Sequence, residues 1–258
     1  FYRPKEVSFM KYFAIRGCRI GEGRPKVILP IVEQTEEAIL EKAAQFSTWK
    51  ADCVEWRVDL FADAQDLSAV ARCAAKLRVA LKNKLLLITF RTKAEGGEKA
   101  IDSMDYFAMN AQLSALGAPL VDLELFLCEQ YDDIAKATVQ AMHDMGTKLI
   151  ISNHDFAKTP AREEIADRYK RMMALNADLP KIAVMPQNER DVMVMLAAMN
   201  ESTAFCGPLI GISMGELGKV TRVRGGAFGS VMTFASKGKA SAPGQIDAET
   251  LSKMLNEN

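Results

Sequence analysis

Cys53-Val-Glu-Trp-Arg-Val-Asp59 is an apolar run with the length and composition of a buried β-strand, yet it carries three ionisable side chains. Similar runs recur along the chain at intervals of about 30 residues. The eight runs are Val27–Val32, Cys53–Asp59, Leu85–Arg91, Leu120–Phe126, Lys148–His154, Lys181–Gln187, Leu209–Met214 and Phe228–Ser236. Longer stretches with helical spacing separate them, and eight strand–helix repeats predict an α/β fold, a closed parallel (β/α)8 TIM barrel.

The stretches between the runs predict eight helices. In the first, Thr35-Glu-Glu is a typical helix start, and Ile39, Ala43 and Phe46 lie on one face, as in an amphipathic helix packed on a sheet. The predicted helices are Thr35–Lys50, Asp66–Leu81, Asp102–Leu116, Tyr131–Met145, Ala161–Leu175, Glu189–Ala198, Glu216–Val223 and Ala248–Leu255. Ahead of the repeats, two short strands around a Gly-containing turn in Lys11–Gly23 predict a β-hairpin that closes the bottom of the barrel.

Length and composition suit one barrel. The chain has 258 residues, 49% of them hydrophobic and 26% charged, and its short linkers show no break in composition. We therefore expect a single domain over residues 1–258, with residues 1–9 either an extension or a remnant of cloning. After the eighth run, Lys237–Ile246 is rich in small, turn-forming residues and is interpreted as a lid.

The charge balance narrows the class of partner. Lys plus Arg and Asp plus Glu both number 33, so no basic field favours nucleic acid or an anionic membrane, and a small molecule is the expected partner. No apolar run approaches the roughly 20 residues of a membrane span. The five cysteines are odd in number and lack a Cys-x-x-Cys pair, which favours reduced thiols in the cytoplasm. Tyr12–Ile15 is too short for a secretory signal core, so we predict no signal peptide.

Strand parity directs charged side chains into the barrel. Side chains alternate across a strand, so Glu55, Arg57 and Asp59 share one face while their apolar neighbours face the helices. The same parity directs four more polar residues inward: Arg91, Asp122, Glu124 and His154. Buried charges are costly unless they pair with one another or with a polar ligand. A salt-bridge network without chemistry is the alternative for any one pair, but charges from four neighbouring strands favour a catalytic cavity.

The chain has only two histidines. His154 ends an apolar run, at the mouth of the predicted barrel, where a neutral imidazole suits general acid–base catalysis near pH 7 better than a core histidine. His143 lies near the end of a predicted helix and is interpreted as an exposed residue without a catalytic role.

Lys181 opens the sixth run, and the pattern leaves two directions for its side chain. At the lower rim it would be an ordinary surface charge. Pointing inward, it would be desolvated and able, as a free amine, to attack a carbonyl.

The sequence does not match the motifs of nucleotide-binding or metal-binding sites. In the stretch that ends Gly218-Lys-Val-Thr221, Ser213 replaces the first glycine of a phosphate loop and Val220 follows the lysine. No Gly-x-Gly-x-x-Gly follows a strand, and no His, Cys and carboxylate spacing matches a metal site. We therefore predict no cofactor and no metal.

Seven stretches resemble type I 3-dehydroquinate dehydratases in order and spacing, each on a different predicted strand or its loop. They are Glu55-Trp-Arg-Val-Asp59, Thr89-Phe-Arg-Thr92 with Glu95-Gly-Gly97, Asp122-Leu-Glu-Leu-Phe126, Ser152-Asn-His-Asp-Phe156 with Lys158-Thr-Pro160, Lys181-Ile-Ala-Val-Met-Pro186, Phe228-Gly-Ser230 and Ser241-Ala-Pro-Gly-Gln245. The match runs nearly end to end. The resemblance implies a cofactor-free lyase that converts 3-dehydroquinate to 3-dehydroshikimate and water, in the shikimate pathway of aromatic amino acid biosynthesis.

The resemblance also implies roles for individual residues. Lys181 would form an imine with the substrate ketone, His154 would move the protons of a syn elimination, and Glu95 would orient the histidine and raise its basicity. Arg222 would bind the substrate carboxylate, with Arg224 as its rival. The residues expected to contact substrate are Glu55, Arg57, Arg91, Arg222, Ser241 and Gln245. Family members are often dimers, so a cytoplasmic homodimer is expected.

Two other functions fit parts of the pattern. A class I aldolase would share the barrel and the lysine, but the absence of a recognisable phosphate loop after the last strands counts against it. A catalytically inactive barrel that only binds is disfavoured by the intact lysine, histidine and arginines. Biosynthetic and quinate-degrading roles use the same chemistry and stay open.

Overall fold

Eight parallel strands form the ring of the barrel in the computed structural model, which describes residues 12–256. The strands are β3 (Lys26–Ile31), β4 (Cys53–Arg57), β5 (Leu85–Thr89), β6 (Leu120–Glu124), β7 (Lys148–Asp155), β8 (Leu179–Val184), β9 (Ile210–Ser213) and β10 (Met232–Ser236). From β3 to β9 each strand pairs with the next one in the chain, and β10 pairs with β3. The predicted (β/α)8 barrel is confirmed; the predicted extension, residues 1–9, lies outside the described residues.

The ring closes between β9 and β10 through a short, irregular seam. The Leu209 amide donates to the Gly229 carbonyl at 3.3 Å, and the Val231 amide donates to the Leu209 carbonyl at 2.9 Å. The Ser230 hydroxyl accepts the Gly211 amide at 3.2 Å, in place of a main-chain partner. Side-chain and loop atoms therefore complete the hydrogen bonding that regular strand pairing supplies elsewhere.

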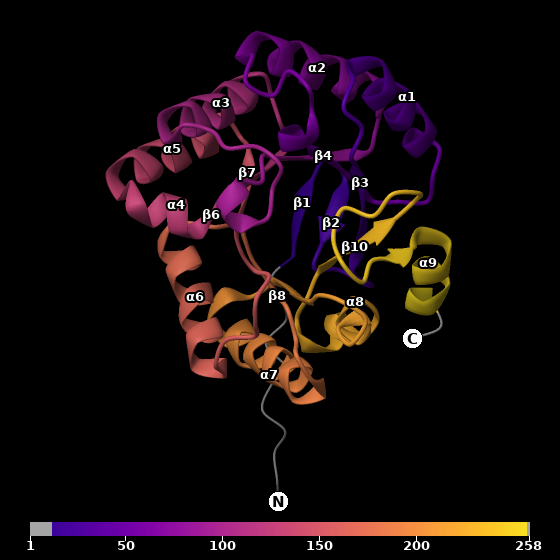
Figure 1. The fold of residues 1–258 in the computed structure, drawn as a ribbon, viewed down its shortest axis with the longest axis vertical. Coiled ribbons are helices and arrows are strands. Elements are labelled where there is room, and N and C mark those ends of the chain that lie inside the picture. The colour runs from indigo at the N-terminus through magenta and orange to yellow at the C-terminus, as the bar shows by residue number, and fades with distance from the viewer. Residues whose placement is uncertain (1–11, 257–258) are drawn as a thin grey trace, which may run out of the picture.

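Helices surround the ring on its outside (Figure 1). They are α1 (Glu36–Ser47), α2 (Leu67–Ala80), α3 (Ser103–Ala115), α4 (Leu125–Gln130), α5 (Asp132–Asp144), α6 (Arg162–Ala174), α7 (Glu189–Cys206), α8 (Lys219–Arg224) and α9 (Ala248–Asn256). Three 3-10 turns follow strands or a helix: η1 (Val58–Leu60), η2 (Lys93–Glu95) and η3 (Gly225–Phe228). Within residues 12–256, no helix is both long and apolar enough to cross a membrane.

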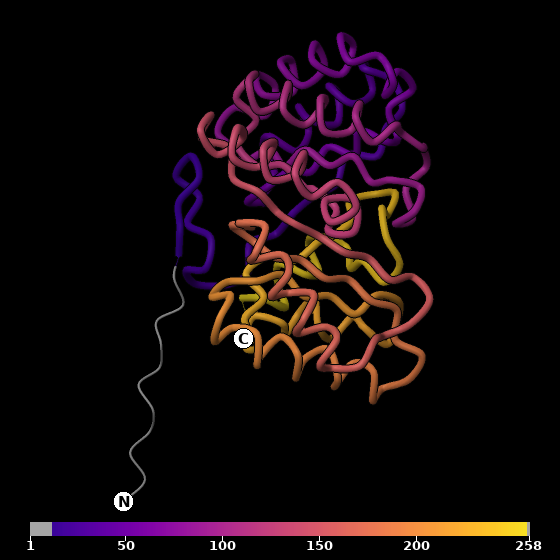
Figure 2. The backbone as a smooth tube through the Cα atoms, turned by 90° about the vertical axis from the view of Figure 1, so that its left-hand side faces the viewer, coloured from indigo at the N-terminus to yellow at the C-terminus, as the bar shows by residue number. Residues whose placement is uncertain are grey.

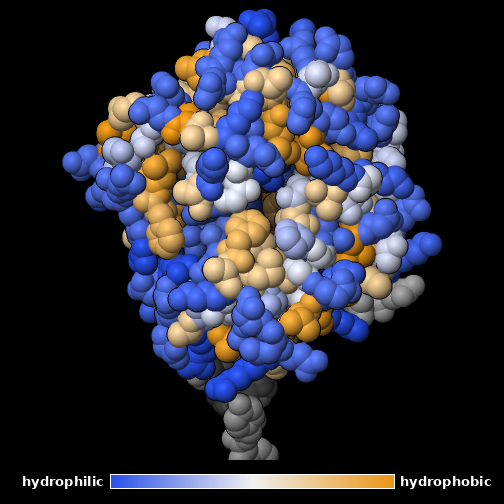
Figure 3. Space-filling view, in the orientation of Figure 1, coloured by the Kyte–Doolittle hydropathy of each residue, from blue (hydrophilic) through white to orange (hydrophobic). Residues whose placement is uncertain are grey.

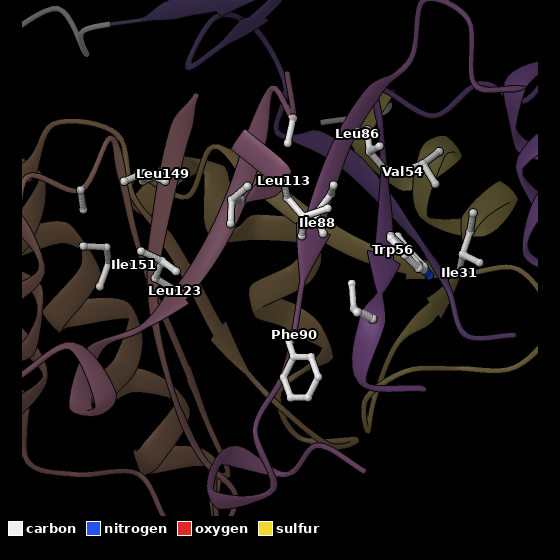
Figure 4. Packing of buried hydrophobic residues seen from close by; sticks show 14 of the residues in the cluster. Ile31, Val54, Trp56, Leu86, Ile88, Phe90, Leu113, Leu123, Leu149 and Ile151 are labelled. Atoms are coloured by element: carbon white, nitrogen blue, oxygen red, sulfur yellow. The ribbon is translucent and has the colours of Figure 1, made fainter. Parts of the chain in front are cut away.

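The apolar face of each strand packs against the helices, as parity predicts. Trp56 lies fully buried in this outer layer, 5.9 Å between ring centroids from Phe61. Figure 4 shows the layer, with residues from neighbouring strands pointing to the same side. They include Ile31, Val54, Leu86, Ile88, Leu123, Leu149 and Ile151. Their alternate neighbours point into the ring, so the sequence pattern of each strand decides which side chains reach the cavity.

An N-terminal hairpin closes the bottom of the barrel. Strands β1 (Phe13–Ile15) and β2 (Cys18–Ile20) pair antiparallel, and Ile15 and Ile20 join the inward-facing apolar cluster. Figure 2 places this hairpin at one end of the barrel and the yellow loop before α9 at the other. The predicted hairpin is confirmed, apart from Lys11, which lies outside the described residues.

Three of the differences between predicted and observed element boundaries are the most informative. The fourth run leaves the strand after Glu124 and turns into the unpredicted helix α4. Helix α7 continues to Cys206, beyond the predicted end at Ala198. The eighth strand starts only at Met232, because Gly225–Phe228 forms a 3-10 turn. In each case the apolar pattern of the segment is compatible with a strand, a helix or a turn. Contacts with neighbouring elements therefore decide which of these forms.

Shortening a buried side chain of the N-terminal hairpin should lower the stability of the protein. We expect Ile20→Ala to reduce the free energy of unfolding by about 2–5 kcal/mol, because its side chain is 0% exposed and leaves a cavity among inward-facing residues. Urea unfolding followed by circular dichroism measures the change. Val79→Ala, at a position 79% exposed, serves as the control and should change stability by no more than about 0.5 kcal/mol. Equal effects for the two variants would contradict the role of Ile20 in closing the bottom of the barrel.

Candidate active site

A cavity of about 260 Å³ opens at the carboxyl ends of the strands. Figure 3 views this face of the molecule, which is hollowed near its centre. All nine site residues predicted from the sequence line it: Glu55, Arg57, Arg91, Glu95, His154, Lys181, Arg222, Ser241 and Gln245. Apolar and small residues complete the wall, among them Phe156, Ala183, Ile212, Met214 and Phe234. The cavity lies where barrel enzymes place their active sites.

Lys181 points into the barrel, which settles the direction that the sequence left open. Strand β8 begins two residues earlier, at Leu179, so Lys181 lies within the strand. Its side chain shares the inward-facing parity of Leu179 and Ala183. The side chain is 4% exposed. Its amine donates to Asp122 at 3.1 Å and lies 4.8 Å from the centroid of the Phe234 ring. A primary amine is thereby held inside the cavity.

Arg91 connects the acidic side chains beneath the cavity. Its guanidinium donates to Asp122 and to Glu124, each at 2.9 Å, and lies 3.7 Å from Glu95. Ser152 donates to Asp122 at 2.6 Å. Although burial alone raises the pKa of Asp122, the positive charges of Arg91 and Lys181 outweigh it and hold that pKa below its usual range. Asp122 therefore stays charged and anchors both cations.

His154 and Glu95 form a buried pair at the edge of the cavity. The Nδ1 atom of His154 lies 2.9 Å from a Glu95 carboxylate oxygen, and the same oxygen accepts the His154 backbone amide at 2.9 Å. The imidazole side chain is 10% exposed. Because Glu95 engages Nδ1, Nε2 is the ring nitrogen left for chemistry in the cavity.

The surroundings shift both members of this pair. Burial, and then the negative charge of Glu124, raise the pKa of Glu95 to about 8, against the opposing effects of Arg91 and Asn153. Burial, followed by the positive charges of Arg91 and Lys181, holds the pKa of His154 well below its usual value. Desolvation and the neighbouring cations therefore dominate the pKa of His154, and the expectation that Glu95 by itself raises the basicity of the imidazole stays a prediction.

Glycines and a buried aspartate position the turn that carries Glu95. Turn η2 ends at Gly96, with φ at 84°, in the left-handed region that favours glycine. A Cβ atom on Gly97 would lie 1.9 Å from the Arg91 carbonyl oxygen, so no larger residue fits there. Asp59 accepts the amides of Arg91 and Glu98 at 3.3 and 3.2 Å. The Glu-Gly-Gly sequence thus follows from the close approach of this turn to its own strand.

Glu55 and Arg57 reach the cavity from β4, as their parity predicts. Glu55 is buried and accepts the Thr89 hydroxyl at 2.8 Å. Arg57 donates through Nε and Nη2 to the two oxygens of Asp59 at 2.8 and 2.7 Å, which leaves Nη1 for the cavity. Burial lowers the pKa of Arg57, but Asp59 outweighs it and raises that pKa above its ordinary value. Asp59 therefore orients the guanidinium and does not line the cavity itself.

Arg222 is a buried cation without a carboxylate partner among residues 12–256. It is 2% exposed, and burial lowers its pKa to about 10. Nη1 donates to the Phe234 carbonyl at 3.3 Å and Nη2 to the Pro243 carbonyl at 3.0 Å, while Nε has no hydrogen-bond partner. Arg224, its rival, is exposed and lines a different hollow near Pro25. Of the two, only Arg222 can meet an anion in the cavity.

The loop after β10 covers the cavity from above. Ser241 and Gln245 bond each other, with Gln245 accepting the Ser241 amide at 3.0 Å and donating to its hydroxyl at 2.9 Å. The Pro243 carbonyl accepts the Gly215 amide at 3.3 Å. A Cβ atom on Gly244 would lie 2.1 Å from the Gly215 carbonyl oxygen, so the loop meets the barrel rim backbone to backbone. The predicted lid is therefore in contact with the residues that it would close over.

The structure adds polar residues that the sequence did not single out. Asn153 donates to Glu95 at 3.0 Å, and Arg168 donates to Asn153 at 2.6 Å. Parity turns Asn153 away from the barrel interior, so the inward pattern could not have found it.

His143, expected to be exposed, is half-buried beside Asp178, with 2.9 Å between Nε2 and a carboxylate oxygen. Asp178 comes from a loop that is distant in sequence, so the pattern of the helix that carries His143 does not reveal this contact.

No metal site is built within the described part of the chain. Across residues 12–256, no group of three or more His, Cys, Asp or Glu side chains is placed to hold a metal ion. The acidic residues of the cavity instead bond arginine, lysine, hydroxyl and amide donors. The groups available for chemistry are an amine, an imidazole and the guanidinium of an unpaired arginine.

The fold and the site define the class of protein: a (β/α)8-barrel enzyme with a buried lysine beside a carboxylate–histidine pair. A family model for type I 3-dehydroquinase matches residues 27–258. The 3-dehydroquinate dehydratase of Bacillus licheniformis is 45% identical over 249 residues, which cover 95% of this chain and 96% of that protein. The chain therefore belongs to the type I 3-dehydroquinase family.

Solved structures agree with this assignment. A type I 3-dehydroquinate dehydratase from Clostridium difficile, with covalently modified comenic acid, superposes with a TM-score of 0.91 and 41% identity, covering 96% of this chain and 97% of that one. The 3-dehydroquinate dehydratase from Enterococcus faecalis gives a TM-score of 0.87 and 38% identity, with 95% and 98% covered. The likeness thus spans nearly all of both chains.

The His154–Glu95 pair should titrate as a unit. With the pKa of Glu95 raised to about 8 and that of His154 well below its usual value, the pair keeps one shared proton at neutral pH and loses it as pH rises through about 8. We expect the ¹⁵N resonances of the His154 ring, in histidine-labelled protein, to shift near pH 8. In Glu95→Gln, which has no carboxyl to titrate, this transition should vanish. An imidazole that instead titrates near pH 6.5 would contradict the arrangement.

Proposed function

We propose that the protein is a 3-dehydroquinate dehydratase that removes water from its substrate through an imine on Lys181. The observation that carries the proposal is the placement of this amine, nearly unexposed, in one cavity with His154 and an unpaired Arg222. Family membership and the 42–45% identity to curated 3-dehydroquinate dehydratases support the same substrate. Together they favour the dehydratase over an aldolase or an inactive barrel.

The imine step starts at the Lys181 amine. Its attack on the C3 ketone forms a C–N bond and, after loss of the carbonyl oxygen as water, a protonated imine. The iminium then accepts electron density from the neighbouring carbon, which makes a C2 proton easier to remove. Asp122, charged and 3.1 Å from the amine, stabilises the positive nitrogen throughout. Hydrolysis of the product imine returns the amine and consumes the water released earlier.

The proton transfers belong to His154. It pairs across the strands with Ala183, two residues beyond Lys181, so the backbone of His154 lies about 6.6 Å further towards the carboxyl end of the barrel than that of Lys181. Both side chains line one cavity, so a ring bound to the lysine would have its next carbon within reach of Nε2. His154 takes the C2 proton and returns a proton to the departing C1 hydroxyl, a syn course served by one imidazole. Net, one molecule of substrate gives one of product and one of water.

The remaining side chains bind the substrate. Arg222 meets the carboxylate by parallel hydrogen bonds, since it has an unpaired guanidinium and a buried Nε without a partner. Glu55, Arg57 and Arg91 contact the ring hydroxyls and the region around the reacting carbonyl. From the lid, Ser241 and Gln245 close over the ring. No step draws on a metal or an organic cofactor.

The cellular setting is part of the same proposal. The reaction supplies the shikimate pathway of aromatic amino acid biosynthesis, in the cytoplasm and as a homodimer. This rests on family resemblance and on cysteines that suit a reducing compartment. The oligomeric state is accessible to light scattering coupled to size exclusion.

Borohydride should trap substrate on Lys181. We expect reduction of the enzyme with 3-dehydroquinate to leave a stable adduct on that residue, because the imine becomes a secondary amine. Peptide mass spectrometry locates it. Lys181→Arg should give no adduct, whereas Lys148→Met, which removes a lysine near the bottom of the barrel, should leave trapping unchanged. An adduct at another lysine, or none, would rule out the imine mechanism.

Removing the imidazole should separate the two halves of the reaction. His154→Ala should still form the trapped adduct, because the Lys181 amine stays in place, but should lose turnover by about 10²–10⁴-fold. The absorbance of the conjugated enone product measures the rate. Turnover close to that of the unaltered enzyme would remove His154 from the proton transfers.

A further inference from the structure

A line of buried hydrogen bonds leads from the catalytic pair out to helix α6. Arg168 donates through Nη1 to the Asn153 side-chain oxygen at 2.6 Å, and Asn153 donates through Nδ2 to Glu95 at 3.0 Å. Arg168 and Asn153 are both buried. Neither lines the cavity of about 260 Å³ that holds Lys181, so neither touches the substrate there.

Arg168 dictates which way the Asn153 amide points. A guanidinium only donates hydrogen bonds, so the amide oxygen must face Arg168 and the NH₂ group must face Glu95. The guanidinium also makes two further contacts, although its Nε has no hydrogen-bond partner. It bonds Glu164 through Nη2 and lies over the Phe126 ring, 5.3 Å from the centroid. The donor that Asn153 offers to Glu95 is therefore held in place by a cation that is locked from three directions.

This donor matters because burial disfavours the charged form of Glu95. Burial and Glu124 raise its pKa to about 8, and the Asn153 hydrogen bond is one of the effects that oppose the rise. The charged groups that face the pair from the surrounding elements are Arg57, Arg91, Asp122, Glu124 and Lys181. When Glu95 is ionised, it accepts the Nδ1 proton of His154 and leaves Nε2 free. When it is protonated, it donates to Nδ1, and the ring proton moves to Nε2.

We propose that Arg168 and Asn153 are positioning residues that stabilise the ionised form of Glu95, the form in which His154 is held in the tautomer with Nε2 free to act as a base. The inference rests on the proposed function, since it concerns the base of that reaction. It assigns a role to a residue on an outer helix, outside the cavity. Arg168 acts only through the amide that it orients.

Arg168→Met tests the proposal with a side chain of similar length and no donor. Without the guanidinium the amide is free to turn its oxygen towards Glu95. We expect the transition of the His154 ring nitrogens, near pH 8 in the unaltered protein, to move up by about one pH unit. The kcat at pH 7 should fall about tenfold while KM changes less than about twofold. His143→Gln, in both proteins, leaves a single histidine signal to follow.

A matched arginine on the same helix provides the control. Arg171 also lies over Phe126, at 5.6 Å from the ring centroid, but it bonds Glu129 and does not reach Asn153. Arg171→Met should leave the His154 titration and kcat unchanged. Arg168→Lys, which retains a donor for the amide oxygen, should restore most of the loss in Arg168→Met.

A second variant keeps the test decisive if Arg168→Met does not fold. Asn153→Asp exchanges the donor for a carboxylate of the same shape, so Glu95 should ionise only at still higher pH. Unchanged titration and kcat in either folded variant would overturn the positioning role. Failure of the unaltered enzyme to dehydrate 3-dehydroquinate would instead sink the proposed function, and the nitrogen titration would still report on Arg168.

Discussion

The site depends on one buried guanidinium placed among three carboxylates. Arg91 follows β5, and its partners come from β6 and from the turn after β5 itself, so a single side chain fixes the relative positions of Asp122, Glu124 and Glu95. Removing one member of such a buried cluster leaves an uncompensated charge, at a cost of about 3–5 kcal/mol. Asp122 in turn accepts a hydrogen bond from the Lys181 amine, and Glu95 bonds the His154 imidazole. The amine and the imidazole are thus both positioned by carboxylates that Arg91 holds, which is why they keep a defined separation on neighbouring strands.

Within that network, similar carboxyl groups take opposite roles because their surroundings differ. Asp122 accepts hydrogen bonds from Arg91, Ser152 and Lys181, and its pKa stays low despite complete burial. For Glu95, burial and then the negative charge of Glu124 raise the pKa to about 8, and Arg91, 3.7 Å away, opposes this rise only in part. The first is suited to hold a cation in place and the second to exchange a proton near neutral pH. The Arg91 guanidinium lies 2.9 Å from Asp122 and 3.7 Å from Glu95, so the position of the turn at Gly96 and Gly97, which carries Glu95, bears on the acid–base chemistry.

The sequence predicts the ring of strands and the inward set of charges because both follow from local periodicity. Glu55, Arg57 and His154 lie where alternation places them. The direction of Lys181 was undecided, since the start of β8 at Leu179 depends on pairing with β7 rather than on the composition of the run. Electrostatic balance could not be predicted either: the low pKa of His154 results from cations on other strands. Arg168 and Asn153 were missed for a related reason, since their meeting depends on how α6 packs against β7. The fold assignment is confirmed, whereas the individual catalytic roles stay predictions.

The lid contacts bear on how the site could be blocked by a drug. Arg222 bonds the main-chain oxygens of Phe234 and Pro243, and Gly215 and Gly244 meet through backbone atoms. A point mutation changes side chains and leaves the peptide carbonyls in place. An inhibitor that anchors on the main chain of Pro243 and its neighbours would therefore rely on groups that a point mutation cannot remove, and escape variants would have to arise elsewhere in the pocket.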